Sequence, residues 1–326
     1  MIIVRSPLRI TLGGGGTDLP SYYQEHDGFV VSASINKYVY ITLVRTFTDD
    51  LCLKYSQTER VKHLDDIKHP LFRGALRLMG INPTGLEITC VADVPARTGL
   101  GSSGSFTTAL LKALHVYMNI PIMAGDLAEL ACKIEIDILH RPVGKQDQYT
   151  AAYGGQNCFW FMRGSEVMVW PLMVDDDIRC PLQDNLLLFF TGVTRNAADT
   201  LQEQVSKCID QDEEMLANLH YARRTGHYAK CVIEDGHLEQ YAEVLNAQWE
   251  SKKKRSCNMS SGQIDRWYTL GMDNGALGGK LVGAGGGGFL LFYARDKEKL
   301  RHAMRQAGLP ELRFLFEGEG TKVIQL

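Results

Sequence analysis

The chain has 326 residues, with 35 Lys and Arg against 38 Asp and Glu, and a formal net charge of −3. This balance argues against a nucleic-acid-binding protein, which would show a dominant basic surface, and no apolar run approaches the roughly 18 residues of a membrane helix. The first residues lack a basic segment followed by an apolar one, so secretion is not expected. Eight scattered cysteines without a Cys-x-x-Cys pair favour reduced thiols over disulfides or zinc. We therefore expect a cytoplasmic protein with no nucleic-acid or membrane partner.

The first half of the chain alternates between extended and helical patterns. β-Branched and aromatic residues predict that segments 29–35 and 38–44 form paired strands. Apolar residues at helical spacing predict a helix over 106–118, and a second helix over 126–140 with Asp126 as its N-cap. The other predicted strands are residues 4–12 and 86–91, and a hairpin of 158–162 with 167–170.

The second half is predicted to form a separate lobe. The run Asp175–Asp177, followed by Pro181, is typical of a boundary, which gives lobes 1–177 and 178–326. Beyond the boundary we expect long amphipathic helices between about 196 and 254. The strands expected there are 186–190, 280–282, 289–293, 313–316 and 322–324. These patterns together predict a two-lobed α+β protein.

Glycine marks the candidate functional segments. Fourteen of the 32 glycines fall in three clusters, at 13–16, 99–104 and 278–288. One such cluster is typical of a loop with positive φ angles. The second cluster, however, precedes a predicted helix, where converging backbone N–H groups bind anions. We therefore expect a phosphate site there.

Two common nucleotide motifs are not favoured. The segment Gly99-Leu-Gly-Ser-Ser-Gly104 formally matches Gly-x-Gly-x-x-Gly, but residues 93–99 separate its middle glycine from the preceding strand, and the nearest acidic candidate, Asp126, begins a predicted helix. Neither Gly144-Lys145 nor Gly279-Lys280 has a glycine five positions earlier or a Ser or Thr after the lysine, so no Walker A loop is present.

Three segments resemble the three motifs of the GHMP kinases, the superfamily of galactokinase, homoserine kinase, mevalonate kinase and phosphomevalonate kinase. They are Pro7–Asp18, Pro95–Ser105 and Lys280–Phe289, in the family's order and spanning nearly the whole chain. The resemblance implies an amino-terminal lobe like ribosomal protein S5 domain 2, a ferredoxin-like carboxyl-terminal lobe, and an active site between them.

A variant of the first motif resembles one branch of this family. Where galactokinases and mevalonate kinases usually carry Gly-Glu-His, this chain has Gly-Gly-Gly-Gly-Thr-Asp-Leu-Pro20. Together with residues 144–149 and 316–320, this variant is similar to sugar-1-kinases that act on D-glycero-D-manno-heptose 7-phosphate. The resemblance implies ATP and Mg²⁺ as co-substrate and cofactor, and a phosphorylated heptose as acceptor. Fucokinase activity, a non-catalytic ligand-binding role and a homodimer remain open.

The resemblance also assigns roles to residues. Asp147 matches the catalytic base, and Arg9 is expected beside it, where its charge favours the ionised carboxylate. Ser103 and Glu135 are expected to hold Mg²⁺, with Asp137 as the competing carboxylate. The residues expected to bind the nucleotide are Pro95, Thr98, Gly99, Leu100, Gly101, Ser102, Ser103, Gly104 and Ser105. Those expected to bind the sugar are Gly14, Gly15, Gly16, Thr17, Asp18, Gly144, Lys145, Gln146, Arg195 and Gly286.

Two parts of the site are left open. Arg141, Lys145, Arg195 and the run 252–255 are alternative partners for the substrate phosphate, although a charge run is usually a solvated helix face. The adenine pocket is expected among loops of the amino-terminal lobe, near residues 55–60.

Overall fold

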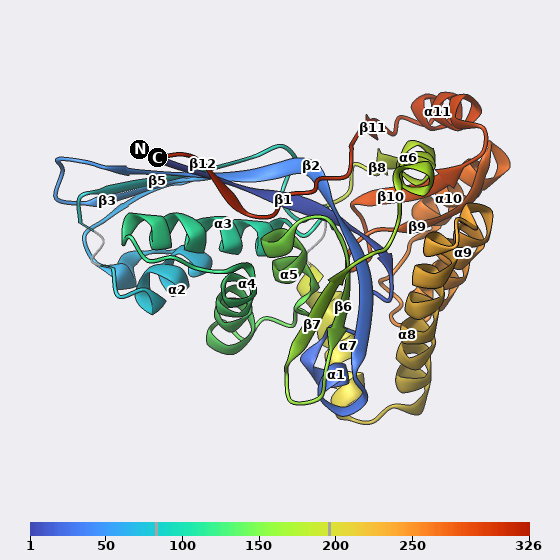
Figure 1. Ribbon diagram of the computed structural model, residues 1–326, viewed down its shortest axis with the longest axis horizontal. Coiled ribbons are helices and arrows are strands. Elements are labelled where there is room, and N and C mark those ends of the chain that lie inside the picture. Colours follow the sequence, from blue (N-terminus) through green and yellow to red (C-terminus); the bar gives the residue numbers. More distant parts are fainter. Residues whose placement is uncertain (82–83, 195–196) are drawn as a thin grey trace.

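The computed structural model describes residues 1–326 except 82–83 and 195–196. Its strands form two sheets, one in each lobe (Figure 1). The first sheet has the order β12-β1-β2-β5-β3-β4, with β6 paired to β2 and β7 to β6. Its strands are β1 (Ile2–Gly13), β2 (Gly28–Arg45), β3 (Leu51–Lys54), β4 (Thr58–Val61), β5 (Leu86–Ala92), β6 (Gln156–Phe161), β7 (Val167–Pro171) and β12 (Lys322–Gln325).

The second sheet is antiparallel, with the order β11-β8-β10-β9. Its strands are β8 (Leu186–Phe190), β9 (Ala276–Leu281), β10 (Phe289–Ala294) and β11 (Glu311–Leu312). Because the only parallel pair among the described strands is β3 with β5, the α+β class predicted from the sequence is confirmed.

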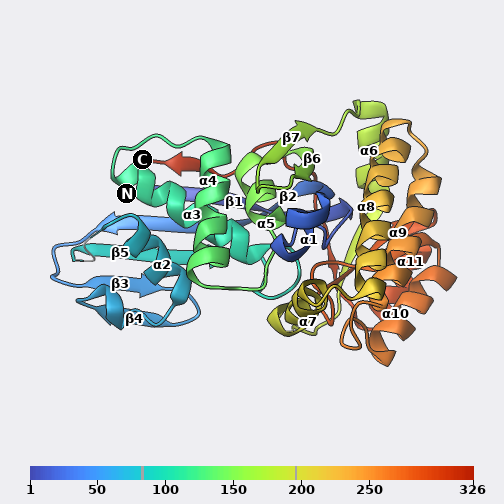
Figure 2. The same cartoon turned by 90° about the horizontal axis from the view of Figure 1, so that it is seen from below.

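Helices cover each sheet. Figures 1 and 2 show α2, α3 and α4 against one face of the first sheet, and α8 and α9 beside the second. The helices of the amino-terminal half are α1 (Pro20–His26), α2 (Pro70–Leu78), α3 (Ser102–Tyr117), α4 (Ala124–Cys132) and α5 (Gln146–Tyr153), with a 3-10 turn at Leu64–Asp66 and a π-helical turn at Lys133–Ile138. Those of the carboxyl-terminal half are α6 (Asp176–Asn185), α7 (Ala197–Ile209), α8 (Glu213–Glu234), α9 (Leu238–Lys253), α10 (Gly262–Asp273) and α11 (Lys297–Gln306). None of the helices in the described ranges is long and apolar enough to cross a membrane.

The two segments predicted as paired strands form one strand instead. β2 runs without a turn from Gly28 to Arg45 and pairs with β1 along its length. Asn36 and Lys37, which would have to form the hairpin turn, do not adopt positive φ. They form a bulge, because Leu8 pairs with Ile35 while Pro7 pairs with Tyr38. The true connection between β1 and β2 is residues 14–27, which include α1.

Other boundaries also differ from the prediction. Helix α4 begins at Ala124, so Asp126 lies in its first turn and does not cap it. The predicted helix over 126–140 changes at Lys133 into the π-helical turn. The short strand expected at 313–316 is wrong: the strand in this part of the chain is β11, Glu311–Leu312, and Phe316 makes only an isolated bridge to Ile35.

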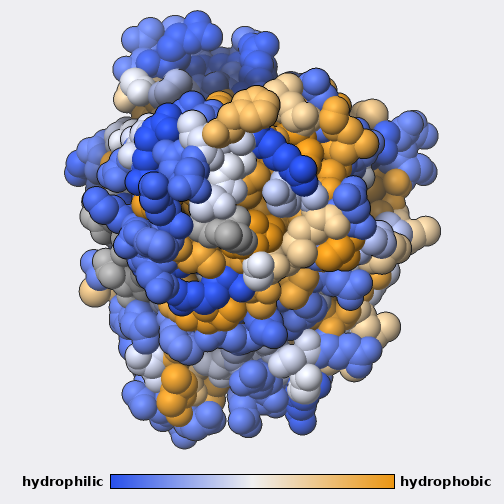
Figure 3. Space-filling model, turned by 90° about the vertical axis from the view of Figure 1, so that its left-hand side faces the viewer, coloured by the Kyte–Doolittle hydropathy of each residue, from blue (hydrophilic) through white to orange (hydrophobic). Residues whose placement is uncertain are grey.

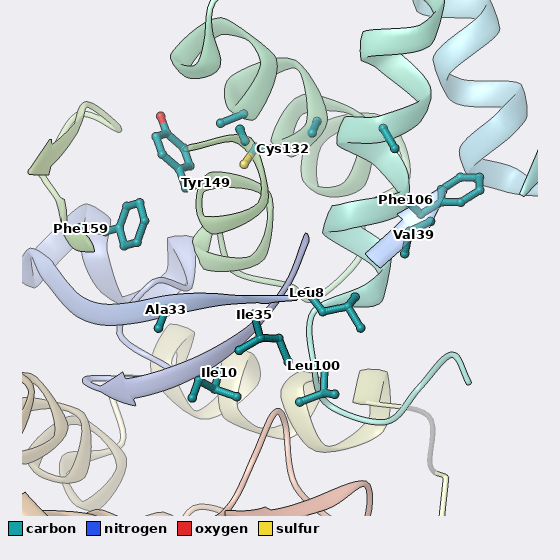
Figure 4. Packing of buried hydrophobic residues seen from close by; sticks show 14 of the residues in the cluster. Leu8, Ile10, Ala33, Ile35, Val39, Leu100, Phe106, Cys132, Tyr149 and Phe159 are labelled. Atoms are coloured by element: carbon teal, nitrogen blue, oxygen red, sulfur yellow. The ribbon is translucent and has the colours of Figure 1, made fainter. Parts of the chain in front are cut away.

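A continuous apolar core joins the two lobes. Residues of β1 from Ser6 onward are buried on both sides, because α3 packs on one face of the sheet and α8 and α9 contact β1 as well. Leu8, Ile10, Ile35 and Leu100 are fully buried members of this core. Figure 4 shows Leu100 on its loop near Leu8 and Ile35, so the loop that precedes α3 is anchored by apolar packing.

Candidate active site

A cavity of about 1190 Å³ lies between the lobes and is lined by residues of both. Its volume exceeds the roughly 300–1,000 Å³ of a typical small-molecule site, so it offers room for two ligands. One end is largely apolar, with Tyr55, Leu71, Cys90 and Phe106 in the lining. Figure 3 faces the end of the molecule that carries β3 and α2, and shows apolar residues around a hollow in the surface.

The second and third glycine clusters meet at this cavity. A Cβ on Gly99 would lie 2.5 Å from the carbonyl oxygen of Val282, and a Cβ on Gly283 would collide with the backbone of Gly99. Likewise, Gly288 leaves no room for a side chain beside Thr98. The loop before α3 therefore keeps its shape because the β9–β10 loop packs directly on it.

Asp147 and Arg9 form an ion pair at the start of α3. Arg9, on β1, lies 2.6 Å from Asp147 Oδ1 through its Nη2, and its Nε donates to the same oxygen at 2.8 Å. Arg9 Nη1 also donates to the carbonyl oxygen of Gly99 at 2.6 Å. A Cβ on Gly104 would lie 2.7 Å from Asp147 Cβ, so the glycine allows α5 to approach α3. The ion pair thus stands beside the predicted phosphate loop, as the sequence motifs predicted.

The first glycine cluster and Asp18 lie against the start of α5. Asp18 accepts hydrogen bonds from the backbone N–H groups of Gly16 and Gln146, each at 3.1 Å. Burial raises the pKa of Asp18, the charge of Asp147 raises it further, and the hydrogen bonds oppose the increase. Gly144 has no space for a Cβ because the Asp18 carboxylate occupies that position. Asp18 and Gln146 line the cavity near Asp147, where an acceptor hydroxyl could be oriented.

Ser103 and Glu135 face one another behind the phosphate loop. Glu135 lies in the π-helical turn, is fully buried, and accepts hydrogen bonds from Ser103, from Gln148 Nε2 at 2.9 Å and from Thr107 at 3.2 Å. Arg141 Nη1 lies 3.1 Å from Ser103 Oγ and 3.2 Å from Glu135 Oε2. Burial raises the pKa of Glu135, and Ser103 and Arg141 counteract it.

These oxygens suit a hard cation. A hydroxyl and a carboxylate are ligands that Mg²⁺ accepts when phosphates and water complete its shell, and Arg141 already places positive charge between them. Within the described residues no group of three or more His, Cys, Asp or Glu could hold a metal by itself. A metal here would therefore depend on the phosphates of a bound nucleotide.

Several residues expected in the site do not line the cavity. Thr17 and Ser105 bind backbone carbonyls with their hydroxyls, and Leu100 is part of the core. Lys145 donates to Glu129 at 2.7 Å and to the carbonyl of Ser165 at 3.0 Å, which directs its ammonium away from the cavity. Also outside the lining are Thr98, Gly104, Glu135 and Gly286, and Arg195 lies outside the described residues. The other predicted site residues line it: Arg9, Gly14, Gly15, Gly16, Asp18, Pro95, Gly99, Gly101, Ser102, Ser103, Gly144, Gln146 and Asp147.

The sequence prediction missed polar groups of the second lobe. Lys280 and Gln248 line the cavity and hydrogen-bond to each other at 2.9 Å. Lys280 begins the third GHMP-like segment but received no role of its own there, and that position was the available signal. Tyr55 and Ser56 line the apolar end, within the segment expected to contact adenine.

Comparison with known proteins agrees with this arrangement. Residues 70–155 match the GHMP kinases N terminal domain, and residues 233–309 match the GHMP kinases C terminal domain. The chain is 31% identical to D-glycero-alpha-D-manno-heptose 7-phosphate kinase of Campylobacter jejuni, over 98% of both chains. It is 25% identical to the bifunctional fucokinase/GDP-fucose pyrophosphorylase of Arabidopsis thaliana, over 91% of this chain and 30% of that one.

The fold of the chain is also similar to that of a solved structure. The crystal structure of a D-glycero-D-manno-heptose 1-phosphate kinase from Bacteroides thetaiotaomicron superposes with a TM-score of 0.83 at 25% identity, covering 100% of this chain and 99% of the other. Both halves of the sequence, the full-length relative and the superposition therefore lead to one conclusion: the chain belongs to the GHMP kinase family.

Proposed function

We propose that the protein transfers the γ-phosphoryl group of ATP to the anomeric hydroxyl of D-glycero-D-manno-heptose 7-phosphate, giving the 1,7-bisphosphate. The observation that carries this proposal is the Arg9–Asp147 pair, which lies between the Gly99–Gly101 loop and Asp18 in one cavity. The Campylobacter jejuni relative, named as a heptose 7-phosphate kinase, supports the choice of acceptor.

Asp147 would act as the general base. Its carboxylate is partly exposed to the cavity, whereas Arg9 beneath it is buried. Arg9 holds the carboxylate in place, where it can accept the proton of the anomeric hydroxyl as that oxygen attacks phosphorus. Asp18 and Gln146 would orient the sugar, with Gly14–Gly16 allowing close approach.

The nucleotide would lie along the loop before α3. Gly101 is the N-cap of α3, with a φ of +79°, and Gly101, Ser102 and Ser103 line the cavity. The unpaired N–H groups of a first helical turn would bind the phosphates there. Ser103 and Glu135 would hold Mg²⁺, which would neutralise part of the phosphate charge. Arg141 would then give up its contact with Glu135. The apolar end lined by Tyr55, Leu71 and Phe106 would receive adenine.

We also propose where the two lobes divide and in which cellular compartment the protein works. The lobes would divide near residue 177, although β12 returns from the second half to pair with β1. All eight cysteines are free, which fits a reducing, ATP-containing cytoplasm.

A substrate panel tests the proposal. The protein, ATP and Mg²⁺ are incubated with heptose 7-phosphate, the same heptose without phosphate, L-fucose and D-galactose, and ADP release is measured. We expect the phosphorylated heptose to give a kcat/KM at least tenfold above the others. Phosphorus NMR of the product should show a new anomeric phosphate, which separates C1 from other positions. A preference for fucose would replace the acceptor, and no ADP release with any sugar would favour a non-catalytic binding protein.

A further inference from the structure

Positive charge dominates the cavity lining. Six of the lining residues are Lys or Arg and two are Asp, a formal difference of four positive charges when every group is ionised: Arg9, Arg97, Arg141, Lys252, Arg255 and Lys280 against Asp18 and Asp147. A magnesium–ATP complex carries a net charge of about −2, and a sugar phosphate adds a further −1.5 to −2 near neutral pH. The nucleotide alone therefore leaves about half of this excess without a counter-charge.

Three of the six cations belong to the second lobe, and two of them, Arg255 and Lys280, contact the first glycine cluster or the end of β1. Arg255 Nη1 donates to the carbonyl oxygen of Gly15 at 2.9 Å, within the first glycine cluster. Lys280 Nζ lies 3.3 Å from the carbonyl oxygen of Leu12, at the end of β1. Lys252 Nζ donates to the carbonyl oxygen of Leu281 at 3.0 Å and to that of Gly283.

None of these three cations forms an ion pair with a carboxylate in the described part of the chain, and the charge of Asp18 acts only on Arg255, from a longer distance. The hydrogen bonds of Lys252, Arg255 and Lys280 go to carbonyl oxygens and to amide side chains of Gln248 and Asn218. Lys280 is 6% exposed and Arg255 is 4% exposed. Burying an uncompensated charge is costly, so buried cations normally have an anionic partner. A cluster of three that opens into a cavity points to an anion supplied by a ligand.

The other three cations belong to the first lobe and lie beside the predicted nucleotide loop. Arg9 is paired with Asp147, and Arg141 contacts Ser103 and Glu135. Arg97 lies in the loop between β5 and α3, next to the nucleotide segment. In a heptose 7-phosphate the ring separates the anomeric hydroxyl from the phosphate, so a sugar whose C1 meets Asp147 would place its phosphate away from the Asp147 carboxylate.

From these observations we propose that Arg255 and Lys280, with Lys252, form the subsite for the phosphate of the sugar substrate. This inference rests on the proposed function and adds the residues that select a phosphorylated acceptor. Gln204, on α7, donates to the carbonyl of Gly16 at 3.1 Å and closes the same side of the sugar motif. Arg255 and Gln204 therefore tie the substrate loop to the second lobe, and the phosphate would reinforce that link.

The test compares two acceptors in three variants. Arg255→Met, Lys280→Met and, as a control, Lys253→Met are assayed with heptose 7-phosphate and with the unphosphorylated heptose at saturating ATP. Lys253 is a neighbouring α9 lysine that pairs with Glu250 and lies outside the cavity lining. We expect kcat/KM for the phosphorylated sugar to fall 10- to 100-fold more than that for the free sugar in the first two variants, with the loss mainly in KM. Lys253→Met should keep the wild-type ratio of the two sugars.

The outcomes separate this inference from the function on which it rests. If the wild type turns over no heptose phosphate, the proposed function fails and the subsite fails with it. If the wild type prefers the phosphorylated sugar but both variants lose equally on the two sugars, the function stands and the subsite is wrong. Should either methionine variant fail to fold by circular dichroism, Arg255→Gln and Lys280→Gln, which also remove the charge, replace them, and the same comparison decides.

Discussion

The Asp147 carboxylate is held in a fixed position by its neighbours, so replacing one of its oxygens with an amide nitrogen tests its role as a base. Its Oδ1 takes both contacts from Arg9, and the close approach of Gly104 fixes its Cβ. Asp147→Asn keeps the shape of the side chain but removes its ability to take a proton. We expect kcat to fall by roughly 10²- to 10⁴-fold, the usual contribution of a general base, while the Kd for ATP changes less than about threefold. Steady-state assays and calorimetric titration with ATP measure the two effects. Full turnover by the variant would mean that the hydroxyl attacks without this base.

The buried side chain of Lys280 is proposed to bind the substrate phosphate, and its charge also affects the free energy of unfolding. Burial, together with the charges of Arg9 and Arg255, lowers its pKa to about 7. In the unfolded chain the lysine is protonated up to about pH 10.4. Between these two values the unfolded state binds more protons, so the free energy of unfolding rises with pH across this window. At or below pH 7 the folded protein carries the full cost of the buried charge.

Lys280→Met should therefore stabilise the protein most at low pH. We expect the gain in unfolding free energy over wild type to be larger at pH 6 than at pH 9 by about 1–3 kcal/mol, from one to two pH units of linkage. Urea unfolding at both pH values, without ligand, gives the difference. A gain that does not change with pH would show that the lysine is not buried in its charged form. The same variant should bind the sugar phosphate less well, a trade of function for stability.

At the scale of elements, the active site depends on two loops that fit together without side chains. Gly283 has a φ of +81°, and a Cβ there would meet the backbone of Gly99. Gly308 has nearly the same φ, +79°, but has no atom within 4 Å of its Cβ position. Substituting each of these two glycines therefore distinguishes the cost of backbone strain from the cost of a steric clash.

Gly308→Ala should cost about 1–2 kcal/mol of unfolding free energy, the strain of a left-handed residue, and leave the KM for ATP unchanged. Gly283→Ala carries that strain and also pushes the β9–β10 loop off the loop before α3. We expect it to cost at least about 1 kcal/mol more and to raise the KM for ATP tenfold or more. Urea unfolding and ADP release measure these effects. Equal effects of the two substitutions would show that the contact between the loops does not matter.

The elements also show what the sequence could and could not predict. Alternating and continuous apolar runs predicted β5, β8 and β10 well, because burial leaves a direct mark on residue type. The single strand β2 was divided in two because a bulge at Asn36 and Lys37 resembles a turn in composition. The π-helical turn around Glu135 has no composition of its own, so the helix was predicted as continuous.

Some residues of the candidate site could likewise be predicted from the sequence, and others could not. Asp147, Arg9, Asp18 and Ser103 stand in motifs and were found from their neighbours in sequence. Lys280 and Gln248 come together only through the packing of α9 on β9, which depends on the tertiary fold. Lys145, in contrast, was predicted to bind substrate because of its place in a motif, whereas its ammonium group pairs with Glu129.

For the whole molecule, the shared core keeps the two lobes together around the cavity. Val4, Leu8 and Ile10 of β1 belong to the same buried cluster as Ile233 of α8 and Leu245 of α9. The final strand β12 then pairs with β1. The second lobe is thus fixed against the first sheet from both ends of its chain, which places its cations opposite the residues of the first lobe.

The chain as a whole is negatively charged, whereas the charged residues that line its cavity are mostly cations. We therefore expect the KM of an anionic substrate to depend on salt concentration. The chain has a formal net charge of −3, whereas the cavity lining contains six Lys or Arg side chains and two Asp. Attraction of an anionic acceptor into the cavity is screened as the Debye length shortens, from roughly 10 Å at 0.1 M salt to 3 Å at 1 M. Raising KCl from about 50 to about 500 mM should increase the KM for heptose 7-phosphate roughly three- to tenfold and that for the free heptose less than about twofold. Saturating ATP with excess Mg²⁺ keeps the nucleotide site filled in both series. Parallel increases for the two sugars would mean that salt acts on the protein or nucleotide and that the cavity charge does not guide the acceptor.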